Sequence, residues 1–105
     1  MSWTLKIKST RPNTDTEFYR EGASYLSDSA LETQKSAYED SGKLISCTVE
    51  TSSNELELLK TWVFKDKETM KEWFDDTKIT DYVSARDTYN TNNSITREKV
   101  QNEET

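Results

Sequence analysis

The chain contains no histidine, and this absence removes more chemistry than any other feature of its composition. Histidine is the usual general base near neutral pH, the commonest nitrogen ligand of metals and a member of the standard nucleophile triads. The single cysteine, Cys47, excludes an intramolecular disulfide and a structural zinc site. No glycine-rich phosphate loop and no spaced aspartate series of a calcium loop occurs. We therefore expect no catalytic residue, no metal and no cofactor.

Long apolar runs and an N-terminal leader are also missing. No stretch approaches the roughly 18 apolar residues of a membrane-spanning helix, and no charged and then apolar segment opens the chain. The 20 acidic residues outnumber the 14 basic ones, which gives a net charge of −6. A surface of that sign repels a phosphate backbone. We expect a cytoplasmic protein that binds neither membranes nor nucleic acids.

Aliphatic residues are scarce, because Leu, Ile, Val and Phe together number 18 of 105 residues. With this net charge, disorder has to be considered. Three Trp and five Tyr replace part of the missing apolar surface, and the chain has only one Pro and two Gly. The composition predicts one folded domain over residues 1–100 with an aromatic core, and a frayed polar tail over residues 101–105. Cys47 is expected to be a small, buried apolar residue of that core.

The N-terminal segment has the pattern of a strand. Trp3, Leu5 and Ile7 alternate with polar residues, which predicts a strand with one buried face. Residues 11–15 contain Pro and Asn, and we expect a turn there. Residues 16–26 remain ambiguous between an extension of the strand and a loop with a partial helix.

A first helix is predicted after this region. Ser27 or Asp28 can cap its N-terminus, it runs to about Ser41, and Gly42 is suited to end it. Its predicted apolar stripe consists of Ala30, Leu31, Ala37 and Tyr38.

Two further strands are predicted over residues 43–52 and 55–65, with a polar turn between them. The second of these carries apolar residues at both parities: Leu59 and Val63 alternate with Leu56, Leu58, Trp62 and Phe64. In a sheet with one solvent-exposed face, apolar and polar residues alternate more strictly. We therefore expect this strand to be covered on both sides.

The C-terminal part contains two more helices and a strand. Asp66 can cap a helix whose apolar stripe is Met70, Trp73 and Phe74. A short third helix is expected to start at Thr80 or Asp81 and to end before the Asn-rich residues 90–93, and a last strand follows over residues 94–100. The third helix carries Tyr82, Val83, Ala85, Arg86 and Tyr89.

The predicted fold class is α+β. The order β-α-β-β-α-β, with an added short helix, is that of a ferredoxin-like four-stranded antiparallel sheet with the helices on one face. The other face then lacks cover, and a second copy of the chain is the economical occupant. We expect a homodimer through this sheet face, with an apolar and aromatic interface and charged residues at the rim.

Residues 59–64, the helix opening at residues 66–70 and the pair Trp73–Phe74 form a strand that contains Trp followed by an acidic helix start. In this pattern the chain resembles the dimeric α+β barrel superfamily, which includes antibiotic-biosynthesis monooxygenases and stress-responsive barrel proteins. The resemblance covers about residues 43–100 and implies a barrel-forming dimer. The haem-degrading branch depends on an iron-ligating His, which this chain lacks.

The cofactor-free oxygenases of that superfamily place Asn, Trp and Arg around an aromatic substrate. The resemblance implies such a place for Trp62 and Arg86, whereas Asn54 falls in a hairpin. Packing in the core is the alternative for Trp62, and a surface ion pair is the alternative for Arg86. The carboxylates of Asp75, Asp76 and Asp81 are expected to be a solvated helix end, because adjacent helical residues point apart.

Ferredoxin-like sheets also form RNA-recognition domains, but residues 56–64 lack the basic-Gly-aromatic pattern of those domains. Two functions remain. The first is a small, non-catalytic, dimeric binding or interaction protein; the alternative is a cofactor-independent monooxygenase-like enzyme that acts on a small aromatic substrate. A cavity of a few hundred Å3 with convergent polar groups between helices and sheet distinguishes the two, because a solid core there would leave the enzyme no place to act. Any small-molecule ligand is expected at this place. The predicted ligand-binding residues are Trp62, Trp73, Tyr82 and Arg86.

Overall fold

The computed structural model describes residues 1–19 and 29–105, and these residues form a four-stranded antiparallel sheet and three helices. The α+β class is therefore confirmed. No helix of the described ranges is long and apolar enough to cross a membrane. In chain order the elements are β1 (Trp3–Thr10), α1 (Ser29–Asp40), β2 (Leu44–Thr51), β3 (Glu57–Phe64), α2 (Lys67–Asp75), α3 (Thr77–Asn92) and β4 (Thr96–Glu104).

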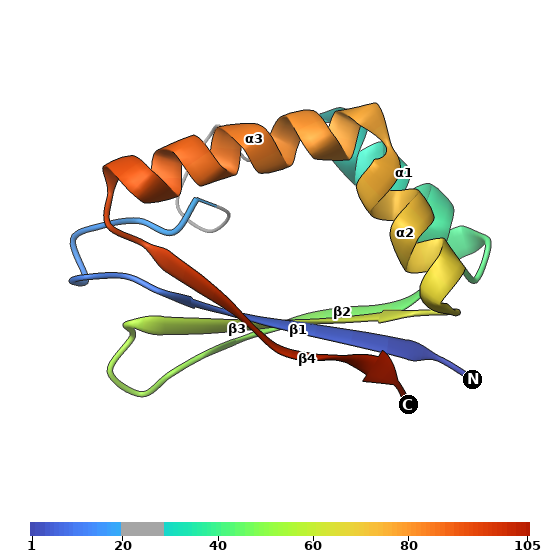
Figure 1. Ribbon diagram of the computed structural model, residues 1–105, viewed down its shortest axis with the longest axis horizontal. Coiled ribbons are helices and arrows are strands. Elements are labelled where there is room, and N and C mark those ends of the chain that lie inside the picture. The colour runs from blue at the N-terminus through green and yellow to red at the C-terminus, as the bar shows by residue number, and fades with distance from the viewer. Residues whose placement is uncertain (20–28) are drawn as a thin grey trace.

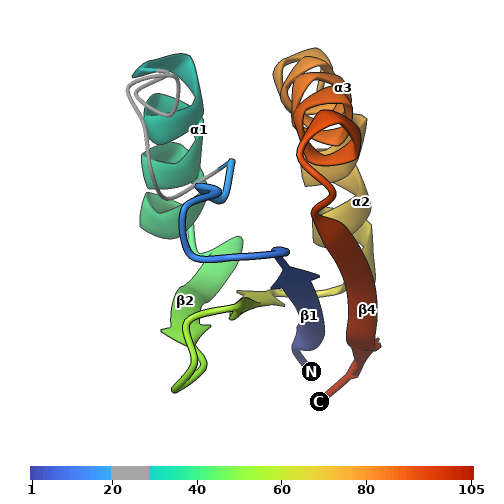
Figure 2. The same ribbon diagram turned by 90° about the vertical axis from the view of Figure 1, so that its left-hand side faces the viewer.

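The sheet has the strand order β2-β3-β1-β4, and every neighbouring pair is antiparallel. All three helices lie on one face of this sheet, with α1 over the side of β2 and with α2 and α3 over the side of β1 and β4 (Figure 1 and Figure 2). On the opposite face lies no helix or strand of the part of the chain that the structure describes. The predicted arrangement of one sheet with helices on one face is confirmed.

The strand β1 has the predicted alternation in part: Leu5 and Ile7 are buried, but Thr4 is buried as well and Trp3 is only half-buried. The turn after β1 is also confirmed. The Asn13 side chain accepts hydrogen bonds from the backbone N–H of Asp15 and of Thr16 and from the Thr16 hydroxyl, at 3.0 to 3.1 Å. This is the local bonding by which Asn stabilises a turn.

The apolar core divides into two clusters. The central cluster consists of Leu5, Ile7, Leu44, Trp62, Phe64, Trp73 and Ile79. The end cluster is smaller and consists of Phe18, Leu58 and Ile95. Cys47 was expected to be buried; it is half-buried and packs against the central cluster.

The first helix differs from its prediction in the face that it buries. Gly42 has a φ of +78°, and the backbone N–H of Lys43 donates to the Tyr38 carbonyl at 2.9 Å, so the predicted glycine end is confirmed. Ala37 is exposed instead of buried, and Gln34 is buried instead. The predicted caps Ser27 and Asp28, most of residues 16–26, and the side chains of Ala30 and Leu31 lie outside the described part.

The second helix begins as predicted, whereas the third begins earlier and is longer. The Asp66 carboxylate accepts from the backbone N–H of Thr69 at 2.8 Å, which caps α2. The helix α3 has 16 residues and starts at Thr77, because Asp76 caps it by accepting from the Lys78 N–H at 2.9 Å. Ile79 joins the buried face of α3, and Ala85 is exposed.

The last strand corrects the expectation of a frayed tail. It runs from Thr96 to Glu104, because residues 101–104 pair with the first half of β1. The Trp3 indole N–H donates to the Asn102 side chain at 2.7 Å, and the Thr105 N–H donates to the Ser2 carbonyl at 2.9 Å. The two ends of the chain therefore lie side by side (Figure 1).

Candidate functional site between the sheet and two helices

A cavity of about 370 Å3 lies between the helix-covered face of the sheet and the helices α2 and α3. Its floor is formed by every second residue of β1, β3 and β4, and its roof by one face of α2 and α3. Its volume lies at the lower end of the range of about 300–1,000 Å3 that is typical of ligand pockets. The cavity that the ligand predictions require is therefore present.

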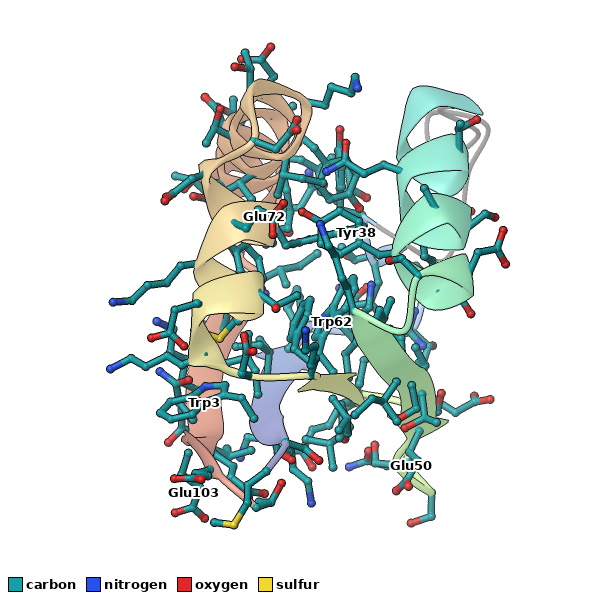
Figure 3. All side chains as sticks on the ribbon, turned by 90° about the vertical axis from the view of Figure 1, so that its right-hand side faces the viewer. Trp3, Tyr38, Glu50, Trp62, Glu72 and Glu103 are labelled. Atoms are coloured by element: carbon teal, nitrogen blue, oxygen red, sulfur yellow. The ribbon has the colours of Figure 1, made fainter. Side chains whose placement is uncertain are left out.

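All four predicted ligand-binding residues line this cavity, and they come from three elements. The ring of Trp62 on β3 lies 5.4 Å from that of Trp73 on α2, and Trp62 points from the sheet toward the helices (Figure 3). Tyr82 and Arg86 are half-buried on α3. Trp62 also stacks on Phe64 at 5.7 Å and 7°, so it belongs to the core and to the cavity wall at once.

Three rows of paired residues make up the floor, because strand pairing places residues of β3, β1 and β4 side by side. One row is Trp62, Leu5 and Asn102; the next is Lys60, Ile7 and Lys99; the third is Leu58, Ser9 and Arg97. The row with the two lysines thus lies between the row of Trp62 and the row of Leu58.

A bulge in β4 sets which of its residues face the cavity. The pairing shifts between Lys6 and Ile7, so that Val100 is an extra residue of β4. As a result Arg97, Lys99 and Asn102 all line the cavity, although Asn102 has the opposite parity in sequence.

Two polar side chains of α3 line the roof one helical turn apart, Arg86 and Asn90. The Arg86 guanidinium contacts the exposed Asp87 carboxylate at 3.2 Å. Asn90 is only 7% exposed and lines the cavity. A side-chain amide can both donate and accept hydrogen bonds, so Asn90 can bind a ligand or water there.

Positive charge is concentrated around the cavity. The described residues that line it include five of the 14 basic residues of the chain, Lys60, Lys71, Arg86, Arg97 and Lys99, but only one of the 20 acidic residues, Asp75. This charge has the opposite sign to that of the whole protein, which carries a net charge of −6.

Arg97 is a partly desolvated cation, and the Asp87 carboxylate compensates its charge only in part. Its side chain reaches solvent, yet neighbouring protein atoms displace enough water around the guanidinium to lower its pKa to about 10, and the positive charge of Arg86 adds to this effect. In the part of the chain that the structure describes, no carboxylate forms an ion pair with Arg97. At neutral pH the side chain remains protonated.

Sequence reasoning missed Lys60, Asn90, Arg97 and Lys99 as cavity residues, although a signal for three of them is present. Lys60 stands between Leu58 and Trp62 at the parity that faces the core, and Arg97 and Lys99 follow Ile95 at the same parity. A cation at a core-facing strand position requires an explanation, because removing a charged group from water is costly.

The acidic residues at the end of α2 do not form a catalytic pair. Asp76 caps α3, Asp75 lines the cavity, and Asp81 is exposed on α3. Within residues 1–19 and 29–105, no three His, Cys, Asp or Glu side chains come together as metal ligands would. The described cavity lining thus offers Asp75 as its only carboxylate.

Comparisons of the chain with protein-family models, with curated proteins and with solved structures found no match. The function is therefore argued from the site itself.

Proposed function

We propose that this protein is a small, non-catalytic binding protein whose ligand occupies the cavity between the sheet and the helices α2 and α3. One observation carries this proposal. Aromatic side chains from three elements and several polar side chains converge on one cavity of about 370 Å3. This combination of apolar walls and a few polar groups is characteristic of small-molecule sites.

The composition argues against a cavity that stays empty, because such a cavity would lower the stability of the protein. Protein cores are packed nearly as densely as organic crystals, and an unfilled cavity lowers stability. This chain has few aliphatic residues, yet Trp62, Trp73, Phe74 and Tyr82 surround a space that they do not fill. Such a use of scarce apolar surface is favoured when a ligand completes the packing.

The enzyme alternative, a cofactor-independent monooxygenase-like activity on a small aromatic substrate, is favoured by the same aromatic walls and by Arg86. The binding function is preferred because the chain has no histidine and the described lining has a single carboxylate, Asp75. Oxygen consumption in the presence of any aromatic compound that binds distinguishes the two. Turnover that persists after removal of metals and cofactors would establish the enzyme.

We also propose that the domain is ferredoxin-like, belongs to the dimeric α+β barrel superfamily and forms a homodimer through the helix-free sheet face. The strand order and the single helix-covered face support the fold, and the half-buried Leu59 and Val63 on the open face support the interface. The structure changes the expected character of that interface. Lys8 lies beside Leu59 and contacts the carboxylates of Glu57 and Glu98 at 3.5 and 3.7 Å, so charges lie within the face and not only at its rim.

Light scattering over a dilution series tests the dimer. A dimer has twice the 12.2 kDa mass of the chain, and replacing Val63 with Lys would return it to the monomer mass. A folded species of monomer mass at micromolar concentration would contradict both the dimer and the barrel. The ligand cavity does not depend on this result, since α2, α3 and the sheet of one chain enclose it.

An unbiased small-molecule screen, read by thermal shift, tests the binding function. Ser9 lines the cavity on β1, and Ser9→Phe would fill part of it; Thr10→Phe places the same ring on the next residue, which faces away. Compounds that raise the melting temperature of the native protein and of Thr10→Phe, but not of Ser9→Phe, would support the site. Stabilisation of Ser9→Phe to the same extent, or no stabilising compound at all, would contradict it.

A further inference from the structure

Cations line the cavity in both layers of the core. In the sheet, the row with Lys60 and Lys99 lies between the Trp62 row and the Leu58 row. In α3, Ile79 belongs to the central cluster and Tyr89 packs against the end cluster, and Arg86 lies between them. Ile7 of the central cluster lies between the two lysines, so cations flank the apolar core in both layers.

This arrangement is unfavourable in a protein without ligand. A domain of this size has little core to spare, and partly buried like charges repel each other. Burial and the charge of Arg86 lower the pKa of Arg97, and the attraction of the Asp87 carboxylate offsets this only in part. The Asn90 amide lines the same wall and can donate hydrogen bonds. An anion in the cavity would compensate the charge of Arg97 and accept a hydrogen bond from Asn90.

The shape of the site indicates which anion. Guanidinium groups bind carboxylates through paired N–H donors, and Arg86 and Arg97 approach from opposite layers. Along β1, Ser9 in the row of Arg97 and Leu5 in the row of Trp62 are four residues apart, which is roughly 13 Å. That length accommodates one charged group and a body of about two fused rings.

Building on the proposed function, we propose that the ligand is an amphipathic aromatic carboxylate. Its carboxylate lies between Arg86 and Arg97, within reach of the Asn90 amide, and its apolar body lies against Trp62 and Trp73. Lys60, whose ammonium group lies 4.3 Å from the centre of the Trp62 ring, and Lys99 contribute positive potential along the floor.

Calorimetric titration with two probes of the same shape tests this assignment. The probes are 2-naphthoate and 2-naphthamide, which differ in charge but hardly in size. At pH 7 and low salt we expect the native protein to bind the carboxylate at least about tenfold more tightly, since a charge-assisted hydrogen bond contributes that much. The preference should shrink as salt is added.

The variant Arg97→Gln should reduce this preference to about twofold or less and leave the affinity for 2-naphthamide unchanged. Because Arg97 reaches solvent, this variant is expected to fold. Lys78→Gln is the matched control: it removes the same charge from an exposed position of α3 outside the cavity, and its preference should equal that of the native protein.

Equal affinity of the native protein for the two probes would overturn the anion assignment while leaving a small-molecule site in place. An unchanged preference in Arg97→Gln, or an equal loss in Lys78→Gln, would also overturn it. Binding of neither probe, together with no stabilising compound in the screen, would overturn the proposed function and this inference with it.

Discussion

Arg86 on α3 and Arg97 on β4 line the same cavity from opposite layers, and the charge of Arg86 contributes to the lowered pKa of Arg97. Burial contributes more to this lowered pKa than the charge does. Two guanidinium groups that face the same cavity repel each other. They therefore lower the stability of the free protein and raise its affinity for an anion. Residues that lower the stability of a protein in this way are often found at functional sites.

The first prediction concerns the stability of the free protein. Replacing Arg97 with Met keeps most of the apolar stem and removes the charge, so the repulsion from Arg86 disappears. We expect the free energy of unfolding to rise by about 0.5 kcal/mol, the scale of charge interactions near the surface. Urea unfolding without ligand measures this effect, and a clear loss of stability would show that Arg97 has a structural role instead.

Most of the fold could be predicted from the sequence, because its elements carry local signals. The alternation of β1, the Asp66 cap of α2 and the glycine after α1 each depend on a few neighbouring residues. The start of α3 was missed because β-branched Thr77 and Ile79 have low helix propensity and concealed the Asp76 cap. The length of β4 was missed because its residues are nearly all polar, and only pairing with β1 makes them a strand.

The candidate site was predictable only in its aromatic half. Trp73 and Tyr82 were identified as apolar residues of the two predicted helices, whereas Trp62 and Arg86 were implied by the resemblance to the α+β barrel superfamily. The cationic half depends on register: Lys60 and Lys99 become neighbours of Ile7 through the pairing of distant strands, and the bulge at Val100 decides which residues of β4 face inward. Neither the register nor the bulge has a signal in a single sequence.

A second prediction concerns Gln34, a buried side chain of α1. It is 9% exposed, and among residues 1–19 and 29–105 neither polar atom of its amide has a hydrogen-bond partner. An unsatisfied buried amide costs roughly 1–3 kcal/mol, so Gln34→Met should raise the free energy of unfolding by about 1 kcal/mol. The control is Glu39→Met at an exposed position of the same helix, where we expect a change below about 0.5 kcal/mol. Equal effects of the two substitutions in urea unfolding would contradict the assignment.

The third prediction is a loss of stability in acid that depends on Asp66. Hydrogen bonds from the Thr69 side chain and backbone hold the pKa of the Asp66 carboxyl below its ordinary value of 3.8. Since the folded pKa is the lower one, the stability from this cap is present above pH 3.8 and is lost as the pH falls through the folded pKa. Asp66→Asn keeps an acceptor oxygen, and its melting temperature should fall less between pH 5 and pH 2. Asp81→Asn, at an exposed position, should follow the native curve.

The fourth prediction is a loss of stability in alkali that depends on Tyr38. Tyr38 points from α1 toward Glu72 of α2 (Figure 3). Burial raises the pKa of its hydroxyl above 10.0, and the carboxylates of Glu72 and Asp76 raise it further. The unfolded chain then releases this proton at lower pH than the folded one, so stability falls as the pH rises above 10.0. In Tyr38→Phe the slope of unfolding free energy against pH should be smaller in that range; an identical slope would count against the shift.

The most direct test of the central claim is a titration of the isotopically labelled protein with 2-naphthoate, followed by two-dimensional NMR. The three Trp side chains report on different places, because Trp62 and Trp73 line the cavity and Trp3 does not. We predict large shifts of the indole N–H signals of Trp62 and Trp73 and of the Nε–H signals of Arg86 and Arg97. The signals of Leu59 and Val63, on the open face of the sheet, should stay in place. Shifts confined to that open face, or no shifts at saturating probe, would contradict a ligand site between the sheet and the helices.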